Sequence, residues 1–383
     1  MQSLFKTLFL TAALALPLSS PLFAQDAQEP LPTPPVESQR IQQQVDVVFV
    51  IDTTGSMAGL IEGAKRKVWA IANTIIDQRP NARIRIGLVA YRDIGDEYVT
   101  RAYPLSTDIQ GIYGKLLSFQ ADGGGDTPES VNEALDVAVG KQPWVSTSMP
   151  GSSRILFLVG DAPPHMDYQQ DRKYPEIIKA ARQKGIIVNA VQAGDMAATR
   201  PIWQEIAQRG GGEYIAIPQD GGRVVVIDTP YDNEIIIIQK KLNATVIPYG
   251  SRAKQSEVAD RAHAYESAPA PAAADMSSYV NKSGKGKAVI TGGGDLVAEI
   301  QEGRQLADIP PAELPPAMQK MSRAEQTAYI ARQTRERDDL SRQLAEKVRQ
   351  RDAFMREADR KDTGKQGDSF DRAVARTLEK QIK

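Results

Sequence analysis

The sequence predicts a doubly wound α/β domain with a mostly parallel sheet, followed by a helical C-terminal region. Apolar runs alternate with segments of helical spacing through the first half of the chain. These runs are continuous, as in strands buried on both faces, and one short connection marks an antiparallel edge strand. Such alternation is typical of βαβ units, in which helices cover both faces of a parallel sheet.

Composition limits the chemistry that the chain can perform. Its 383 residues suggest more than one folded unit, and its formal net charge is -1, with two histidines and no cysteine. The near-zero charge gives no electrostatic case for binding nucleic acid or a membrane surface. The absence of cysteine excludes disulfides and thiol nucleophiles, and the two distant histidines exclude multi-histidine zinc sites. Any chemistry must therefore use oxygen ligands, amines or backbone groups.

Residues 1–24 have the pattern of a signal peptide. Lys6 precedes a short apolar run, and Ala24 is a small residue at the expected cleavage point. The run is shorter than the roughly 20 residues that a membrane-spanning helix needs, although an uncleaved anchor is the alternative. We expect an exported protein, periplasmic or secreted, with no integral membrane segment after signal removal. Residues 25–44 are rich in proline and are expected to be an unpacked linker.

The elements of the α/β domain are expected from residue 45 onward. Strands are predicted at 45–51, 84–91, 98–105, 155–160, 186–191 and 213–217. Helices are predicted at 57–77, 108–118, 128–139, 174–184 and 200–209. The segment 98–105 alternates in polarity and follows its predecessor closely, which predicts an antiparallel edge strand. The resulting Rossmann-like domain is expected to span 45–246.

The remaining chain divides into a connecting region with short helices, 247–320, and a charged helical extension, 321–383. Ser322 and Glu325 form a capping-box pair at the start of the extension. Two narrow apolar stripes follow, at Leu340, Leu344, Val348 and Met355 and at Phe370, Val374, Leu378 and Ile382. We expect these helices to fold back on each other or on the α/β domain. A coiled-coil or partner-binding role is the alternative, but Arg351 interrupts the first stripe.

Polar side chains gather where the predicted strands end. The first strand leads into Asp52, Thr54 and Ser56, and the strand at 155–160 delivers Asp161. Ligands of a doubly wound sheet bind outside the carboxyl ends of its strands, so these side chains are expected at one edge.

A glycine-rich loop is expected to complete this site. Gly123 to Gly125 precede Asp126 and Thr127 at the start of a predicted helix. Two carboxylates and three hydroxyls, without imidazole or thiolate, describe a site for a hard cation such as Mg²⁺. These ligands leave one direction open for an anionic oxygen of a partner.

The pattern Asp52-x-Thr54-x-Ser56, with Thr127 in GGGDTPES and Asp161 in LFLVGDAPPH, resembles the metal-ion-dependent adhesion site of von Willebrand factor type A domains. The resemblance covers the α/β part of the chain. It implies a protein-binding module that depends on Mg²⁺, with Mn²⁺ or Ca²⁺ as alternatives, in which these five side chains coordinate directly or through water. The implied partner is a protein that offers an Asp or Glu carboxylate. Adhesive members of the family switch affinity by moving the last helix of the domain, for which 231–242 is the expected counterpart here.

Simpler explanations stay open for several of these residues. The hydroxyls of Thr54 and Ser56 are suited to capping the following helix without any metal. His165 is expected to be a solvated residue at the rim. The alternative function is a structural or assembly role in the cell envelope through the C-terminal helices, and a metal-assisted hydrolase is a third. The chain has no phosphate-binding loop and no nucleophile elbow, so catalysis is not expected.

Overall fold

The computed structural model describes residues 43–125, 127–220, 229–268, 270–283, 289–361 and 370–382. The predicted signal peptide and nearly all of the predicted linker lie outside these ranges. The strands are β1 (Gln44–Asp52), β2 (Arg83–Tyr91), β3 (Thr100–Ser106), β4 (Ser153–Gly160), β5 (Ile187–Ala193) and β6 (Gly211–Ile217). The helices among them are α1 (Ala58–Gln78), α2 (Ile109–Leu117), α3 (Val131–Lys141), α4 (Tyr174–Gln183) and α5 (Thr199–Gly210).

The six strands form one sheet in the order β3-β2-β1-β4-β5-β6. All neighbours pair in parallel except β3, which runs antiparallel to β2 at the edge. The predicted fold class and the predicted edge strand are therefore confirmed. The order reverses between β1 and β4, which makes the carboxyl ends of these two strands the place where a doubly wound sheet binds ligands.

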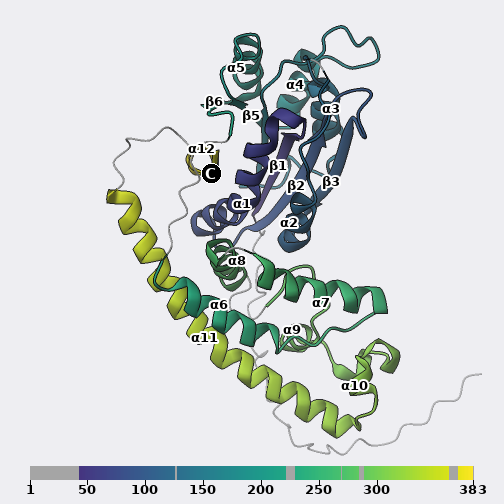
Figure 1. Cartoon of the computed structure of the whole chain (residues 1–383). Helices are drawn as coiled ribbons and strands as arrows, with labels where there is room; N and C mark the ends of the chain where they lie inside the picture. Colours follow the sequence, from purple (N-terminus) through teal and green to yellow (C-terminus); the bar gives the residue numbers. More distant parts are fainter. Residues whose placement is uncertain are drawn as a thin grey trace, which may run out of the picture. The chain divides into compact units, whose positions relative to one another are not determined.

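Helices cover both faces of the sheet (Figure 1), and every residue of the central strands β1 and β4 is buried, as the continuous apolar runs predict. Along β1, Val47, Phe49 and Ile51 belong to a core that α1 and α2 share, whereas Val48 and Val50 belong to a core beneath α3, α4 and α5. This division follows from the two-residue period of a strand, which sends successive side chains to opposite faces. The central strand is thus held rigidly, and so is the turn that follows it.

The later helices are α6 (Asp232–Asn243), α7 (Arg252–Ser267), α8 (Ala270–Ser283), α9 (Leu296–Gln301), α10 (Pro316–Gln319), α11 (Arg323–Lys361) and α12 (Phe370–Gln381). Helix α12 packs on α1 and β6 and adds Val374, Leu378 and Ile382 to the core on the α1 face. The expectation that the helices of the extension fold back on each other or on the α/β domain is confirmed for α12, which lies on the α/β domain. None of the helices in the described ranges has an apolar stretch long enough to cross a bilayer.

Helix α11 begins with the predicted capping box, because the Ser322 backbone N–H donates to the Glu325 carboxylate at 2.7 Å and the Glu325 N–H donates back to the Ser322 hydroxyl at 3.3 Å. The apolar stripe of α11 packs on α6 and α8. Arg351, which interrupts the stripe, is buried and pairs with Asp232 and Asp275 at 2.7 and 2.8 Å. The apolar stripe of α11 is therefore buried by packing against other helices of the same chain.

The segment expected to be the last helix of the α/β domain is α6, and the structure places it differently. Helix α6 packs mainly on α8 and α11, where Ile235, Ile238 and Leu242 form a separate apolar cluster. It is α12, more than a hundred residues later, that lies on α1 and β6. The sequence pattern did not show this difference because both helices carry apolar residues, and only tertiary packing decides which helix covers α1.

Candidate functional site

The site begins at the turn between β1 and α1. Asp52 ends β1 and is fully buried, Thr54 is buried, and Ser56 is exposed. The backbone N–H and the hydroxyl of Thr54 both donate to Asp52 Oδ1, at 2.9 and 2.7 Å. The hydroxyl oxygens of Thr54 and Ser56 lie 3.3 Å apart. Neighbouring oxygen ligands of an octahedral Mg²⁺ lie about 3 Å apart, so this spacing suits a shared ion.

The capping explanation for these hydroxyls does not fit the geometry. Thr54 precedes the 3₁₀ turn Gly55–Met57 and makes no side-chain capping hydrogen bond, and Met57 precedes α1 without one. Instead, the Thr54 hydroxyl donates a hydrogen bond to Asp52, which leaves the lone pairs of the hydroxyl oxygen available to bind a cation. The turn therefore presents oxygen acceptors toward the sheet edge.

Asp161 reaches the same edge from β4. Gly160 is the last residue of β4, and a Cβ at Gly160 would lie 3.1 Å from Asp52 Oδ2 and collide with the Tyr91 hydroxyl. A glycine here therefore lets two polar side chains approach the backbone just before Asp161. Asp161 is buried, and its charge acts on Asp52 strongly enough to contribute to a raised pKa there.

The glycine-rich loop lies directly against this turn. The Gly55 N–H donates to the Gly123 carbonyl at 3.2 Å, and a Cβ on Gly124, whose φ is +77°, would lie 2.9 Å from Thr54 Cβ. Glycine is required at this close approach. Thr127 is exposed, and among the described residues no recorded hydrogen bond joins its side chain to the other four predicted ligands. Asp126 lies outside the described residues.

Glu129, two residues after Thr127, lies at the site although the sequence pattern did not indicate it. It is 4% exposed, and its Oε2 atom has no hydrogen-bond partner within the described part of the chain. Burial, together with the charges of Asp52, Asp93, Asp96 and Asp161, raises its pKa to about 9. A glutamate before a helix is an ordinary favourable residue at a helix start, so its sequence position gave no distinct signal.

The carboxyl group of Asp52 also has a raised pKa. Burial and the nearby charge of Asp161 raise the pKa of Asp52 to about 7, although the hydrogen bonds from Thr54 and the nearby Tyr91 hydroxyl lower it in part. Asp52 Oδ2 and the Tyr91 hydroxyl oxygen make no hydrogen bond of standard geometry within the described residues. Carboxylates that share a buried region resist ionisation unless a positive charge joins them. Orphaned carboxylate oxygens beside two hydroxyls form a donor set that fits a hard dication.

The candidate cation site is not a cluster of acidic or histidine side chains alone. Within the described residues, no three Asp, Glu or His side chains are placed to hold a metal ion together. The candidate donors of the β1 turn are instead one carboxylate, Asp52, and the hydroxyls of Thr54 and Ser56. The structure brings these three together, places Asp161 beside them, and leaves Thr127 on the exposed loop.

The prediction for His165 is wrong, because this residue is buried and not solvated. Its ring stacks on Tyr168 at 3.9 Å, and its two nitrogens lie 2.8 Å from Asp167 Oδ1 and 3.3 Å from Asp93 Oδ2. The backbone N–H of His165 donates to the backbone carbonyl of Glu129 at 3.0 Å, which joins the loop after β4 to the segment that precedes α3. This contact buries His165 and also fixes the backbone of Glu129.

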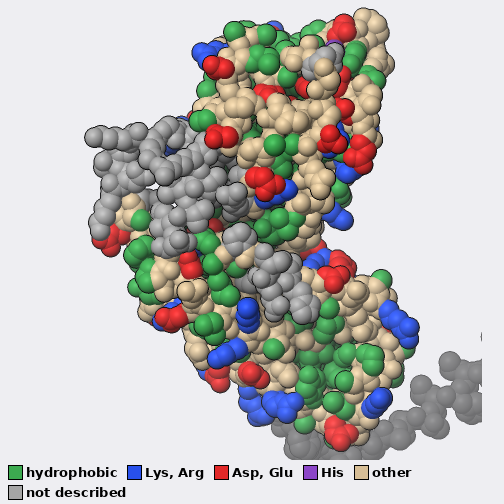
Figure 2. All heavy atoms as spheres, in the orientation of Figure 1, with side chains coloured by type: hydrophobic (Ala, Val, Ile, Leu, Met, Phe, Trp, Pro, Cys, Tyr) green, Lys and Arg blue, Asp and Glu red, His purple; other side chains and the backbone are tan. Residues whose placement is uncertain are grey.

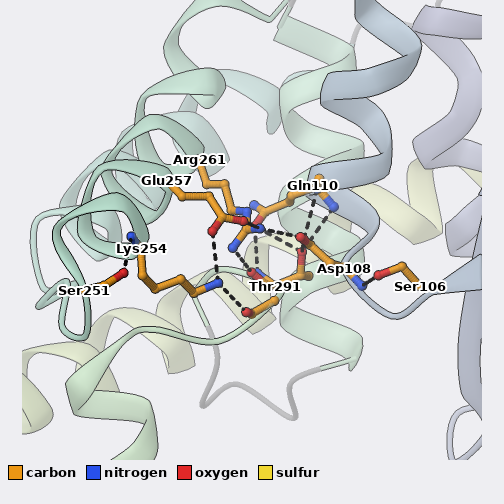
Figure 3. Close-up of polar contacts among 10 residues, drawn as sticks. Ser106, Asp108, Gln110, Ser251, Lys254, Glu257, Arg261 and Thr291 are labelled. Atoms are coloured by element: carbon orange, nitrogen blue, oxygen red, sulfur yellow. Dashed lines mark hydrogen bonds and ion pairs between the residues drawn. The ribbon is translucent and has the colours of Figure 1, made fainter. Parts of the chain in front are cut away.

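A second polar cluster lies away from the strand ends, where α7 meets the start of α2 (Figure 3). Arg261 on α7 pairs with Asp108, which caps α2, and with Glu257. Thr291 donates its hydroxyl to Asp108 at 2.7 Å. A groove of about 860 Å³ runs beside these residues, between α7 and the β3–α2 segment. The charges are paired with one another, so we assign this cluster to holding α7 against the α/β domain.

Comparison with known proteins identifies the family of the α/β part of the chain. Residues 46–228 match the family model of the von Willebrand factor A domain. A putative ariadne-like RING finger protein of Acanthamoeba polyphaga mimivirus is 30% identical over 128 residues, which cover 32% of this chain and 12% of that protein. The alpha-protein kinase vwkA of Dictyostelium discoideum is 27% identical over 128 residues, which cover 33% of this chain and 20% of the kinase. The matches thus span at most a fifth of these relatives.

Solved structures of low sequence identity also match. The protein BatB from Bacteroides thetaiotaomicron is 19% identical, with 45% of this chain and 90% of that chain covered and a TM-score of 0.33. The SpRpn10 VWA domain is 13% identical, with 46% and 89% covered and a TM-score of 0.35. Both matches cover less than half of this chain.

Proposed function

Because residues 46–228 match the family model of the von Willebrand factor A domain, we propose that this chain is a protein-interaction module whose strand-end edge binds a divalent cation. Asp52, Thr54, Ser56, Thr127 and Asp161 are the proposed ligands, directly or through water. Mg²⁺ is the proposed ion, with Mn²⁺ and Ca²⁺ as alternatives. The observation that carries the proposal is the turn after β1, where buried Asp52 keeps an unpartnered oxygen beside two hydroxyls that cap no helix.

The proposed partner is a protein that offers an Asp or Glu carboxylate to complete the shell of the ion. Exposed acids surround the edge on several loops, at Glu97, Asp122, Asp167, Asp195 and Asp220. Acidic side chains are prominent over the α/β part of the face drawn in Figure 2. Such a field repels a partner carboxylate, so an anionic ligand can bind there only when a cation is present.

We further propose that the module works outside the cytoplasm, in the periplasm or as a secreted protein, and that it is not catalytic. The support for export is the signal-peptide pattern of residues 1–24. A binding role agrees with a site of convergent oxygen acceptors on the rim of the sheet. The alternative assembly role through the C-terminal helices loses its main support, since the stripe of α11 is buried against α6 and α8.

Affinity capture from an envelope extract tests the proposed function. The wild-type chain in Mg²⁺ is expected to retain proteins that EDTA releases, and Asp52→Ala and Asp161→Ala are expected to retain none of them. Glu302→Ala, which removes an exposed acid at the end of α9, is the matched control and should behave as wild type. Retention of the same proteins in EDTA would instead support a cation-independent assembly role.

A further inference from the structure

Gln219 lies on the candidate site although it belongs to none of the predicted ligand positions. It follows β6, and its side-chain Nε2 donates to Asp161 Oδ2 at 2.6 Å and to the Ser56 carbonyl at 3.2 Å. The loop that carries it is closely fitted. A Cβ on Gly194 would collide with Gln219 Oε1, and a Cβ on Gly59 would lie 3.1 Å from Asp220.

The position of this amide bears on cation binding. Its NH₂ group donates hydrogen bonds to oxygen atoms of two different segments. A cation at the same place would attract the same two oxygen atoms. The bond to Asp161 involves an ionisable carboxylate and is short, so it belongs to the stronger class of hydrogen bonds. A cation and an N–H donor repel each other and cannot use the same lone pair of Asp161 Oδ2.

We propose that Gln219 is an internal competitor that sets the affinity of this edge for a divalent cation. The inference rests on the function proposed above, since it concerns the same site. Cation binding through Asp161 Oδ2 requires the Gln219 amide to release that oxygen, so the affinity of the ion is reduced by the strength of the amide's hydrogen bonds. Gln219 is exposed at the rim, so its side chain has room to move away.

Calorimetric titration with Mg²⁺ and Mn²⁺ tests the proposal. Gln219→Ala is expected to bind the ion about tenfold more tightly than wild type, since one net hydrogen bond to a charged group is removed from the competition. Gln219→Glu is expected to bind more tightly still, because a carboxylate attracts the ion that an amide N–H repels. Gln208→Ala, an exposed glutamine at the end of α5 near the opposite edge of the sheet, is the control and should match wild type.

Thermal unfolding, with and without the ion, is a second readout. In EDTA, Gln219→Ala is expected to melt at a lower temperature than wild type because Asp161 loses its donor, and excess Mg²⁺ should remove or reverse that difference. Equal ion affinities for wild type and Gln219→Ala, with binding lost in Asp52→Ala, would overturn the role of Gln219 and leave the cation site standing. Ion binding by Gln219→Ala but not by wild type would support the role. No binding by wild type or by either Gln219 variant would overturn the cation site itself.

Discussion

The carboxyl groups of Asp52 and Glu129 are buried side by side with Asp161, and their raised pKa values record the cost of that arrangement. A group kept for folding alone would pair each oxygen with a donor, as Asp52 Oδ1 is paired with Thr54. Asp52 Oδ2 and Glu129 Oε2 have no such partner among the described residues. We therefore expect that replacing either carboxylate by a neutral side chain raises the stability of the folded chain but weakens cation binding.

Asp52→Asn exposes this conflict. The amide keeps an oxygen for Thr54 and removes a buried charge, so the variant is expected to be more stable than wild type in EDTA by about 1–3 kcal/mol at pH 8. It is also expected to lose Mg²⁺ binding. Urea unfolding in EDTA measures the first effect and calorimetry the second. A variant less stable than wild type in EDTA would show that the Asp52 charge supports the fold.

The free energy of unfolding is expected to depend on pH in part through the titration of Glu129. Its pKa is raised from 4.5 to about 9 in the folded chain, so the native state keeps a proton that the unfolded chain releases. The stability that protonated Glu129 contributes in EDTA should therefore be fully present below pH 4.5 and be lost as the pH rises toward about 9. Glu129→Gln should remove this part of the decline. Unfolding curves of the two proteins that run parallel from pH 5 to 9 would refute the assignment.

Among the secondary-structure elements, α11 is fastened to the rest of the chain by a buried ion pair. Arg337 is fully buried, pairs with Asp295 at 2.6 Å, and donates to the hydroxyl and the carbonyl of Thr245, each at 2.9 Å. Arg337→Met leaves the Asp295 charge buried without its partner and is expected to cost about 3–5 kcal/mol of unfolding free energy. Arg342→Met, on the exposed side of α11, is the control and should change stability by less than about 0.5 kcal/mol. Equal losses in the two variants would contradict the role of the buried pair.

Helix α12 is the other element with a sharp test. Leu378 is fully buried in the core that α1 shares, whereas Leu117 at the end of α2 is 44% exposed. Leu378→Ala is expected to destabilise the chain by about 2–5 kcal/mol, with a much smaller effect for Leu117→Ala. Thermal or chemical denaturation of the two variants decides the point. A small loss for Leu378→Ala would mean that α12 is not an integral part of the α/β domain.

Element-scale packing also marks the limit of what the sequence predicts. Each strand from β1 to β6 was predicted because hydrophobic period and buried runs are local signals. The sequence predicted that the C-terminal helices fold back, but it did not show that α12 is the helix that covers α1, because only tertiary packing decides which helix lies there. Helix α12 lies outside the predicted domain 45–246 and packs on the α1 face of the sheet.

The candidate site was predictable to a similar degree. Asp52, Thr54, Ser56 and Asp161 were found because strand ends place them at one edge. Glu129, His165 and Gln219 were missed or misjudged, because their roles depend on how the loops fold over one another. The backbone bond from His165 to Glu129 and the side-chain bond from Gln219 to Asp161 each join segments far apart in the sequence. A local pattern of residue types does not predict such contacts between distant loops.

At the scale of the whole molecule, the sheet supplies a rigid edge, the loops supply oxygen atoms, and the C-terminal helices complete the core beneath them. The most direct test of this account is a calorimetric titration of the purified chain with Mg²⁺ and with Mn²⁺ at pH 8, alongside Asp52→Ala. We expect one saturable site in wild type and none in the variant. The absence of heat and of any thermal stabilisation by either ion in wild type would contradict it.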